Sequence, residues 1–422
     1  MSDALPIPSQ PSADRYKKLA KDLQDAAKSS DDEAVRRWAG GWVKGPGRQA
    51  ERMEWGWKTF KQMDERAGRC TLAGARLFLA RVHGFASWAK FVKFLEAMAS
   101  KSSPVSMFEA AVEAIISGKL TGLEKLLRKN PKLVRARSMR EHGSTLLHYV
   151  SANGVEDFRQ KTPGNIVEIT SLLLHAGAAV NAESNAYGGR STTLGLTATS
   201  CHPEYAGVQL ALLELLLGHG ALIDGPDGRS TVNSCLHNGR GKAAEFLAHR
   251  GARLDLEGAA GTGQLEMVQS FFRKEGRLKP SATRQQMLDG FSWACEFGRT
   301  DVVDYLLQRG MKVDARLRPD GQTGLHWAAY EGQVETVKLL LRNGAAVDIK
   351  DRSYVGTALG WALYAWGAPE RTGRDAYYEV VALLAQAGAK LNPEWYEGDG
   401  ERQRAVEKLR SDRRMMAALG GQ

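Results

Sequence analysis

The chain has 422 residues, of which 43% are hydrophobic and 25% are charged, a composition typical of folded domains and not of disordered chains. Its net charge of +10 permits contact with nucleic acid or anionic surfaces. Because the 48 acidic residues are spread through the sequence, a mixed and solvated surface is the simpler explanation of this excess. No stretch approaches the roughly 20 apolar residues that span a bilayer, so we expect no membrane span.

The cysteines and the N-terminus indicate a cytoplasmic location. Cys70, Cys201, Cys235 and Cys295 lie far apart and show no CxxC spacing. This usage fits reduced thiols better than a disulfide framework. The first residues, MSDALPIPSQPSAD, contain neither the basic nor the apolar segment of a secretory signal.

The first hundred residues are predicted to form a tail and a small helical domain. Residues 1–14 are rich in Pro and Ser, and we expect them to be disordered. Residues 15–99 carry apolar residues at helical spacing, with Thr71 and Ser87 placed to cap two of the helices. Residues 100–106, rich in Ser and Lys, are predicted to be a linker.

The same helical domain is basic and rich in tryptophan, which leaves an alternative function open. We expect Trp38, Trp42, Trp55 and Trp57 mainly to pack in a core. Tryptophans interleaved with basic residues can also stack on bases while the cations contact phosphates. The alternative is therefore binding of nucleic acid or an anionic surface through Lys17, Lys18, Lys21, Arg36, Arg37, Lys44, Arg48 and Arg52.

After the linker, an apolar helix followed by glycine recurs along the chain. The segment LLLHAG, which ends at Gly177, has counterparts that end at Gly220, Gly251, Gly276, Gly310, Gly344 and Gly388. Glycine after the last helical residue accepts the left-handed backbone that closes a helix. An earlier, degenerate copy carries Asn130 at this position. The spacing of 25 to 44 residues indicates a stack of repeated units.

The clearest copy runs from residue 322 to residue 353. We predict a short helix over Gly324–Tyr330 behind Thr323, a turn, and a second helix over Val334–Arg342. The residues after Gly344 are predicted to be extended and to end in a turn. Neither helix can bury its apolar face alone, so the unit requires neighbours.

This copy closely resembles an ankyrin repeat. Thr323, Leu325 and His326 match the TPLH motif, in which Gly324 replaces the proline. The family pattern is also matched by Ala328, Ala329, Gly332, Val334–Val337, Leu339–Leu341, Gly344, Ala345 and Asp348. The resemblance implies an all-α fold: an ankyrin-repeat solenoid of helix-turn-helix units with β-turn fingers, preceded by a small helical domain. Residues 79–96 are similar to a helical segment that often precedes ankyrin repeats in bacterial proteins, so a bacterial protein is expected.

The period sets the expected boundaries. About eight ankyrin repeats are predicted over residues 107–395, with insertions at 153–165, 200–208 and 366–376. The unit between Gly251 and Gly276 is short, and we expect it to have lost its finger or to be tightly joined to its neighbour. Residues 396–422 are predicted to form a C-terminal capping helix that covers the last repeat with Val406, Leu409, Met415 and Leu419.

No pattern in the sequence indicates catalysis, a cofactor or a metal. His148 and His326 each follow Thr-x-Leu and resemble the ankyrin histidine that hydrogen-bonds the loop backbone. The remaining histidines show no HxxxH or HExxH spacing. Residues 258–263, GAAGTG, resemble a glycine-rich dinucleotide-binding loop at first sight. The GxGxxG pattern that starts at Gly261 requires a third glycine at position 266, where the chain has Glu266. The segment instead aligns with the end of a repeat helix. We therefore expect no catalytic, cofactor-binding or metal-binding residues.

The resemblance implies a non-enzymatic scaffold that binds a protein partner, as yet unknown, through its concave face and turn fingers. Tyr, Trp and Arg supply most of the binding energy at protein interfaces. These residue types occur on the predicted finger tips and on the first helix of the clearest repeat. The candidates for contact with the partner are Tyr187, Arg190, Arg229, Arg316, Arg318, Trp327, Tyr330, Arg352 and Tyr354.

Overall fold

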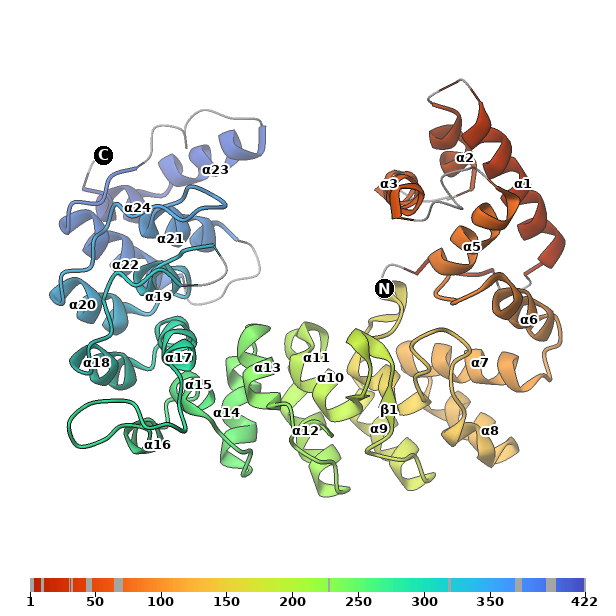
Figure 1. Ribbon diagram of the computed structural model, residues 1–422, viewed down its shortest axis with the longest axis horizontal. Coiled ribbons are helices and arrows are strands. Elements are labelled where there is room, and N and C mark those ends of the chain that lie inside the picture. The colour runs from red at the N-terminus through yellow and green to blue at the C-terminus, as the bar shows by residue number, and fades with distance from the viewer. Residues whose placement is uncertain are drawn as a thin grey trace. The chain divides into compact units, whose positions relative to one another are not determined.

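The computed structural model describes residues 4–8, 11–29, 31, 33–42, 48–63, 71–226, 228–317, 320–368, 374–391 and 400–420. The described residues are mainly helical, which confirms the all-α fold class (Figure 1). The chain divides into two compact units, Met1–Arg229 and Ser230–Gln422. Of the helices described, none is both long enough and apolar enough to cross a membrane.

The first unit begins with a small helical domain. Its described helices are α1 (Ala13–Lys28), α2 (Ala34–Trp42), α3 (Arg48–Met63), α5 (Leu72–Val82) and α6 (Trp88–Met98). The predicted caps are confirmed, because the hydroxyls of Thr71 and Ser87 accept the backbone N–H groups of Gly74 and Lys90. The buried Trp57 ring lies against Phe78, so this tryptophan is a core residue as predicted.

The N-terminal tail is ordered where it is described, which corrects the prediction of disorder. The N–H of Leu5 donates to the carbonyl of Val82 at 2.7 Å, and α1 begins at Ala13 with Ser12 as its cap. Leu5 and Ile7 pack against two apolar clusters of the domain. The tail is rich in Pro and Ser, but it also contains apolar residues, and these pack against the helical domain.

The predicted linker is shorter than expected. Helix α7 (Pro104–Ile116) begins inside residues 100–106, with Ser103 as its cap and proline at its first position, where no N–H is needed. Helix α7 contacts α6, so the helical domain packs directly on the first helix pair.

Three helix pairs follow in the first unit. Their second helices are α8 (Leu120–Lys129), α9 (Ile166–His175) and α12 (Gln209–Gly218). Their other elements are α7, η1 (Pro131–Arg135), η2 (Leu146–Ser151), η3 (Asp157–Arg159), α10 (Thr193–Thr199) and α11 (Cys201–Tyr205). The predicted insertions at 153–165 and 200–208 contain η3 and α11. Between α9 and α10, the antiparallel hairpin of β1 (Glu183–Ser184), η4 (Ala186–Gly188) and β2 (Ser191–Thr192) forms a finger.

The described part of the second unit contains five helix pairs, followed by two terminal helices. The first helices are α13 (Thr231–His237), α15 (Leu256–Gly261), α17 (Arg284–Glu296), α19 (Gly324–Tyr330) and α21 (Ala358–Gly367). The second helices are α14 (Gly241–His249), α16 (Leu265–Ser270), α18 (Thr300–Gln308), α20 (Val334–Arg342) and α22 (Asp375–Gln386). The two helices predicted within residues 322–353 are confirmed as α19 and α20.

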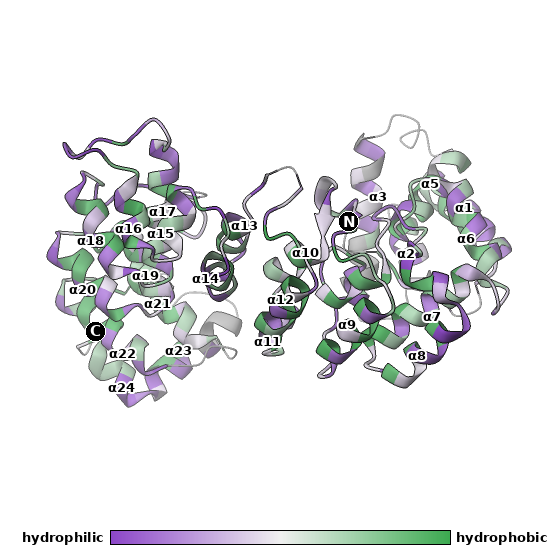
Figure 2. Ribbon diagram, turned by 90° about the horizontal axis from the view of Figure 1, so that it is seen from below, coloured by the Kyte–Doolittle hydropathy of each residue, from purple (hydrophilic) through white to green (hydrophobic). Residues whose placement is uncertain are grey.

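First helices contact first helices, and second helices contact second helices. Contacts run from α13 through α15, α17 and α19 to α21, and separately from α16 through α18 and α20 to α22 (Figure 1). In Figure 2, α18 and α20 carry both hydrophobic and hydrophilic residues, as amphipathic helices do. The buried Val303, Leu306, Val337 and Leu340 form the apolar side of these two helices.

Most of the predicted helix-closing glycines are confirmed. Gly310, Gly344 and Gly388 have φ values of 87°, 79° and 94°, and each follows the end of a second helix. Gly276 is an exception, because α16 already ends at Ser270 and Gly276 lies in a turn that brings Phe272 to Leu278. The pair α15–α16 also lacks a finger at its start, as expected, since Asp255 caps α15 four residues after Gly251.

The glycine that departs from the TPLH motif has a packing reason. A Cβ at position 324 would lie 2.7 Å from Cys295 Sγ and 3.0 Å from the Phe291 ring. The preceding helix α17 therefore leaves no room for any side chain, proline included, at the start of α19.

The C-terminus forms two helices where one was predicted, α23 (Gly400–Ser411) and α24 (Arg413–Ala418). Asp412 separates them, because its carboxylate caps α24 by accepting the N–H of Met415. Leu409, Met415 and Leu419 are buried in the apolar cluster of the second unit. Residues 369–373 of the predicted insertion and residues 392–399 before α23 lie outside the described residues.

Candidate binding surface

Buried histidines hold successive repeats together, as the sequence predicted. The Nδ1 atom of His326 accepts the N–H of Thr323, and its Nε2 donates to the carbonyl of Gly356 in the next finger at 3.1 Å. His148 does the same between Thr145 and Ser191. Burial lowers the pKa of His148 to about 4 and also lowers the pKa of His326, so both rings are neutral at pH 7. These histidines are structural.

An arginine joins adjacent fingers in each unit. Nη1 of Arg316 donates to the carbonyl of Gly321 at 2.9 Å and to the carbonyl of Lys350 at 2.7 Å. In the first unit, Nη1 of Arg137 donates to Gly143 and Glu183 at 2.8 and 2.7 Å. One guanidinium nitrogen carries two N–H groups and can therefore bridge two carbonyls. Arg316, a predicted partner contact, thus has a structural role, although it is exposed.

A single carboxylate organises the finger that follows α20. The buried Asp351 accepts the backbone N–H groups of Ser353, Tyr354 and Gly356 as well as Nε1 of Trp361. Burial would raise the pKa of Asp351, but these hydrogen bonds outweigh it and lower the pKa. The finger projects Tyr354, which is 77% exposed, into solvent. A tip held by this many internal bonds presents the tyrosine with little conformational freedom to lose on binding.

The first helices next to this finger carry a cluster of aromatic rings. The Trp361 ring centroid lies 5.3 Å from Trp327, 5.5 Å from Tyr330 and 6.2 Å from Tyr354, in edge-to-face arrangements. Trp327 and Tyr330 belong to α19, and Trp361 belongs to α21. One turn after Trp361, Tyr364 is 68% exposed. The structure therefore brings together three residues that the sequence had proposed, Trp327, Tyr330 and Tyr354.

Sequence reasoning missed three further members of this surface, although the period itself identifies them. Trp293, Trp327 and Trp361 recur at the 34-residue spacing of the repeats, and Tyr330 and Tyr364 recur in the same way. All five lie on first helices, α17, α19 and α21, and none is fully buried. We call Trp293, Trp327, Tyr330, Tyr354, Trp361 and Tyr364 the aromatic face of the second unit.

The indole nitrogens on this face have different partners. Trp361 Nε1 donates to Asp351 at 3.0 Å, and Trp293 Nε1 donates to Glu257 at 2.9 Å. Trp327 Nε1 is buried and has no acceptor among the described residues. The residue at the position of Asp351 one repeat earlier is Leu317, which offers no carboxylate. The three tryptophans thus occupy equivalent positions in successive repeats, but their indole nitrogens do not have equivalent hydrogen-bond acceptors.

Acidic side chains lie along the same first helices. Glu257 on α15 is held between Trp293 and His237, whose Nδ1 is 3.5 Å from the Glu257 carboxylate. Burial raises the pKa of Glu257 despite these contacts. Asp289 and Glu296 belong to α17, and the half-buried Glu331 caps the end of α19.

The other predicted contact residues lie apart from the aromatic face. Tyr187 and Arg190 occupy the β1–β2 finger of the first unit with φ values of 49° and 58°, a left-handed conformation that is unusual for such side chains. Tyr187 donates its hydroxyl to Asn153, Arg190 pairs with Glu183, and Arg229 donates to the carbonyl of Gly189. In the second unit, Arg352 is exposed and packs over Gly321, while Arg318 lies outside the described residues.

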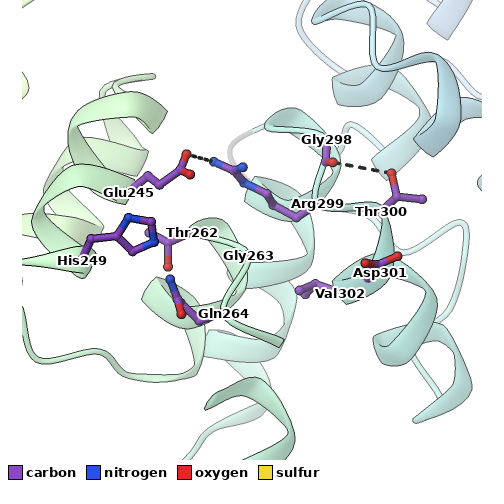
Figure 3. Close-up of a pocket in the computed structure, with 10 residues that line it drawn as sticks. All are labelled: Glu245, His249, Thr262, Gly263, Gln264, Gly298, Arg299, Thr300, Asp301 and Val302. Atoms are coloured by element: carbon purple, nitrogen blue, oxygen red, sulfur yellow. Dashed lines mark hydrogen bonds and ion pairs between the residues drawn. The ribbon is translucent and has the colours of Figure 1, made fainter. Parts of the chain in front are cut away.

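A cavity of about 340 Å³ lies on the second helices of the second unit, at the helix–helix turns (Figure 3). Its lining is mostly polar and includes Glu245, His249, Gln264 and Arg299. Arg299 pairs with Glu245 at 2.8 Å and donates to the carbonyl of Gly261. These contacts link three neighbouring repeats, so Arg299 and Glu245 have a structural role at this cavity.

Four of the eight basic residues proposed for nucleic-acid or anionic-surface binding, all in α1 and α2, form ion pairs with acidic side chains. Lys17 pairs with Asp14 and Lys18 with Asp22, while Arg37 pairs with Asp31. Arg36 contacts both Glu33 and Glu54. Trp55 is exposed on α3, while Lys44 and the side chains of Trp42, Arg48 and Arg52 lie outside the described residues. The pairing provides acidic partners for the positive charge on which nucleic-acid binding would depend.

The first unit also buries four charges that the sequence did not reveal as a group. Arg140 lies 3.0 Å from Glu109 and 2.7 Å from Glu156, and Arg159 lies 2.7 and 3.1 Å from the same two carboxylates. Burial alone would raise the pKa of Glu156, but Arg140, His142 and Arg159 hold it well below its usual range. The Arg140 guanidinium also lies over the rings of Phe85 and Phe94 in the N-terminal domain. The cluster therefore joins that domain to the first repeats.

Two further features of the described residues concern metal ligands and the environment of the cysteines. Within the described ranges, no three His, Cys, Asp or Glu side chains come together in a way that could hold a metal ion. Cys201, Cys235 and Cys295 are free thiols, and burial raises the pKa of Cys235 and Cys295, which makes them unreactive.

A family model supports the resemblance seen in residues 322–353. The family described as ankyrin repeats (3 copies) matches residues 256–352 and 291–394, which contain the helix pairs from α15 to α22. A solved structure that matches is the human ASB11 ankyrin repeat domain, with 21% sequence identity and a TM-score of 0.33. That match covers 67% of this chain and 99% of that chain. A comparison with curated proteins found no match.

Proposed function

We propose that this chain, whose residues 256–394 match ankyrin repeats, is a non-enzymatic ankyrin-repeat scaffold whose second unit binds a protein partner. Ankyrin repeats generally mediate protein–protein interaction. The contact surface in this proposal is the aromatic face together with the finger at residues 351–356. The fold supplies a surface, and the side chains displayed on that surface determine what it binds.

The observation that carries the proposal is the exposure of large aromatic side chains in register with the repeats. Tyr354 and Tyr364 are solvent-exposed next to the partly buried Trp327, Tyr330 and Trp361. Tryptophan and tyrosine are among the residue types that contribute most binding energy at protein interfaces, and they do so in clusters. The patch is also preorganised by the hydrogen bonds of Asp351, which lowers the entropic cost of association.

We also propose a cytoplasmic location for this scaffold. The free thiols of Cys201, Cys235 and Cys295 support it, because reduced cysteines are usual in that compartment.

Photo-cross-linking in lysate tests the binding surface. A benzophenone amino acid is placed at Ser353, next to the exposed Tyr354, and the cross-linked products are compared with and without nuclease. We expect a protein cross-link that survives nuclease and is lost, by at least about tenfold, when Tyr354→Ala and Tyr364→Ala are combined, since two anchors of this kind contribute more than about 1.4 kcal/mol.

The control combines Tyr205→Ala with Leu222→Ala, which removes two similarly exposed apolar side chains from the first unit. This variant should retain the cross-link, and both variants should melt at the wild-type temperature. Nuclease-sensitive products that neither double variant changes would instead point to the basic N-terminal domain.

A further inference from the structure

Two second helices of the first unit end in exposed histidines whose rings lie together. His175 is the last residue of α9, and His219 directly follows the last residue of α12. These two helices contact each other (Figure 1). The ring centroids of His175 and His219 are 5.6 Å apart, with an angle of 78° between the ring planes. Stacking of the repeats thus brings two exposed imidazoles together.

The same kind of backbone contact holds both rings. Nδ1 of His175 lies 2.8 Å from the carbonyl oxygen of Ser171, and Nδ1 of His219 lies 2.9 Å from that of Leu215. A carbonyl oxygen can only accept, so Nδ1 carries the proton and the lone pair of the neutral ring is on Nε2. Among the described residues, neither Nε2 atom has a hydrogen-bond partner. Histidines that ligate metal ions usually donate their other N–H in this way.

The position of the two rings at helix ends also favours a cation. The last carbonyls of a helix have no partner within the helix and carry the negative end of its dipole. His175 and His219 lie at that end of α9 and α12. Arg135, whose Nε donates to the carbonyl of Gly177 at 3.3 Å, is a cation near the end of α9 and reduces the effect there.

The separation of the rings matches what one metal ion requires. Zinc binds imidazole nitrogens at about 2.0–2.1 Å, which places the centroids of two ligating rings about 5–5.5 Å apart in tetrahedral geometry. The observed 5.6 Å is close to this value. Both side chains are exposed, so a small rotation of the rings brings the two Nε2 atoms to one ion without a backbone shift.

We propose that His175 and His219 form a binding site for a divalent transition-metal ion of the zinc, copper and nickel class. The Nε2 atoms are the two protein ligands, and imidazole suits these metals. Water completes the coordination, since within the described ranges no group of three His, Cys, Asp or Glu side chains could hold an ion. The bound ion ties α9 to α12 and so joins the second helices of two successive repeats.

Zinc titration of the tag-free full chain by isothermal calorimetry tests the site. We expect one zinc ion per chain, bound at least about tenfold more weakly by His175→Gln and by His219→Gln, since losing only the outer partner of a metal ligand costs about 10–100-fold in affinity. Electron paramagnetic resonance with copper in place of zinc should show two imidazole nitrogens on the ion in the wild-type chain and one in each variant.

His237→Gln is the matched control. Nδ1 of His237 lies 2.8 Å from the carbonyl oxygen of Asn233, the same contact as in the pair, but its ring contacts Trp293 and not a second histidine. This variant should bind zinc as the wild-type chain does. Without metal, all three variants should melt at the wild-type temperature, because the substituted side chains are exposed.

Zinc should then raise the melting temperature of the wild-type chain and of His237→Gln, but not of the other two variants, because a ligand that binds only the folded state stabilises it. Absence of zinc binding by the wild-type chain would overturn the inference. Binding that survives either His175→Gln or His219→Gln, or that His237→Gln weakens equally, would overturn it as well, since the ion would then not be shared by this pair.

Discussion

Individual residues matter most in this protein where charge is buried. Arg140 is 3% exposed and contacts the carboxylates of Glu109 and Glu156 on one side and the rings of Phe85 and Phe94 on the other. Taking four charges out of water is costly, and the arrangement is tolerable because each arginine contacts both carboxylates. The main effect of such a cluster is to specify how the N-terminal domain packs on the first repeats, and its net contribution to stability is small.

Replacing Arg140 by methionine should therefore destabilise the first unit strongly. The substitution keeps a long apolar side chain but leaves two buried carboxylates to share one arginine, Arg159, and breaking a buried pair in this way costs about 3–5 kcal/mol. Urea unfolding followed by tryptophan fluorescence measures the loss. Arg128→Met, on the exposed side of α8, is the matched control and should change little. Equal stability of the two variants would show that the cluster is not held as tightly as its distances indicate.

Among the elements, the fingers depend on bonds that cross from one repeat to the next. His326 reaches the carbonyl of Gly356, and Arg316 joins the carbonyls of Gly321 and Lys350. Arg316 was predicted from its type and position to contact a partner. That role stays a prediction, while the structure gives the same guanidinium a second role within the solenoid.

The two roles of Arg316 are separable by substitution. Arg316→Ala removes two carbonyl hydrogen bonds, and we expect the free energy of unfolding of the second unit to fall by about 1–2 kcal/mol, a modest value because the site is exposed. Arg316→Lys should recover only part of this, since an ammonium does not present the planar fork of a guanidinium. Thermal melting of these variants beside Arg342→Ala, an exposed change on α20, makes the comparison. Unchanged melting of Arg316→Ala would assign this arginine to surface contact alone.

At the scale of the whole molecule, the second unit needs a cover for its last repeat. Helix α24 packs on α22, and Leu409, Met415 and Leu419 complete the apolar cluster. Tyr378 donates to Asp412, and Lys408 donates to the carbonyl of Gly367, so polar contacts fix the cover in place. An open stack exposes the apolar side of its final helix pair unless a terminal segment with a polar outer side closes it.

Shortening the buried side chains of these terminal helices should expose the apolar surface of the last repeat. Combining Leu409→Ala with Met415→Ala removes two buried side chains, each worth about 2–5 kcal/mol in a core. We expect a lower melting temperature and increased binding of a hydrophobic dye. Glu407→Ala, an exposed change on the same helix α23, should have neither effect. If the double variant melts like wild type, the last repeat must be stable without its cover.

The sequence by itself determined the repeat architecture, because the information is local. Apolar residues at helical spacing, Thr323 before α19 and glycines after the second helices act within a few residues, and the structure reproduces them. The same period contained the spacing of Trp293, Trp327 and Trp361, so most of the aromatic face could have been read from the sequence.

Only the tertiary structure decided which distant groups meet. The contacts of Arg140 with Glu109 and Glu156, and of Arg316 with Lys350, join residues whose pairing depends on how one repeat stacks on the next. The tail at Leu5 likewise became ordered because a surface formed by α5 was available to it. The sequence states which side chains carry charge or apolar area, but the free energy of a charge or a ring depends on its neighbours and on its burial. Those are properties of the stacked repeats and not of any one of them.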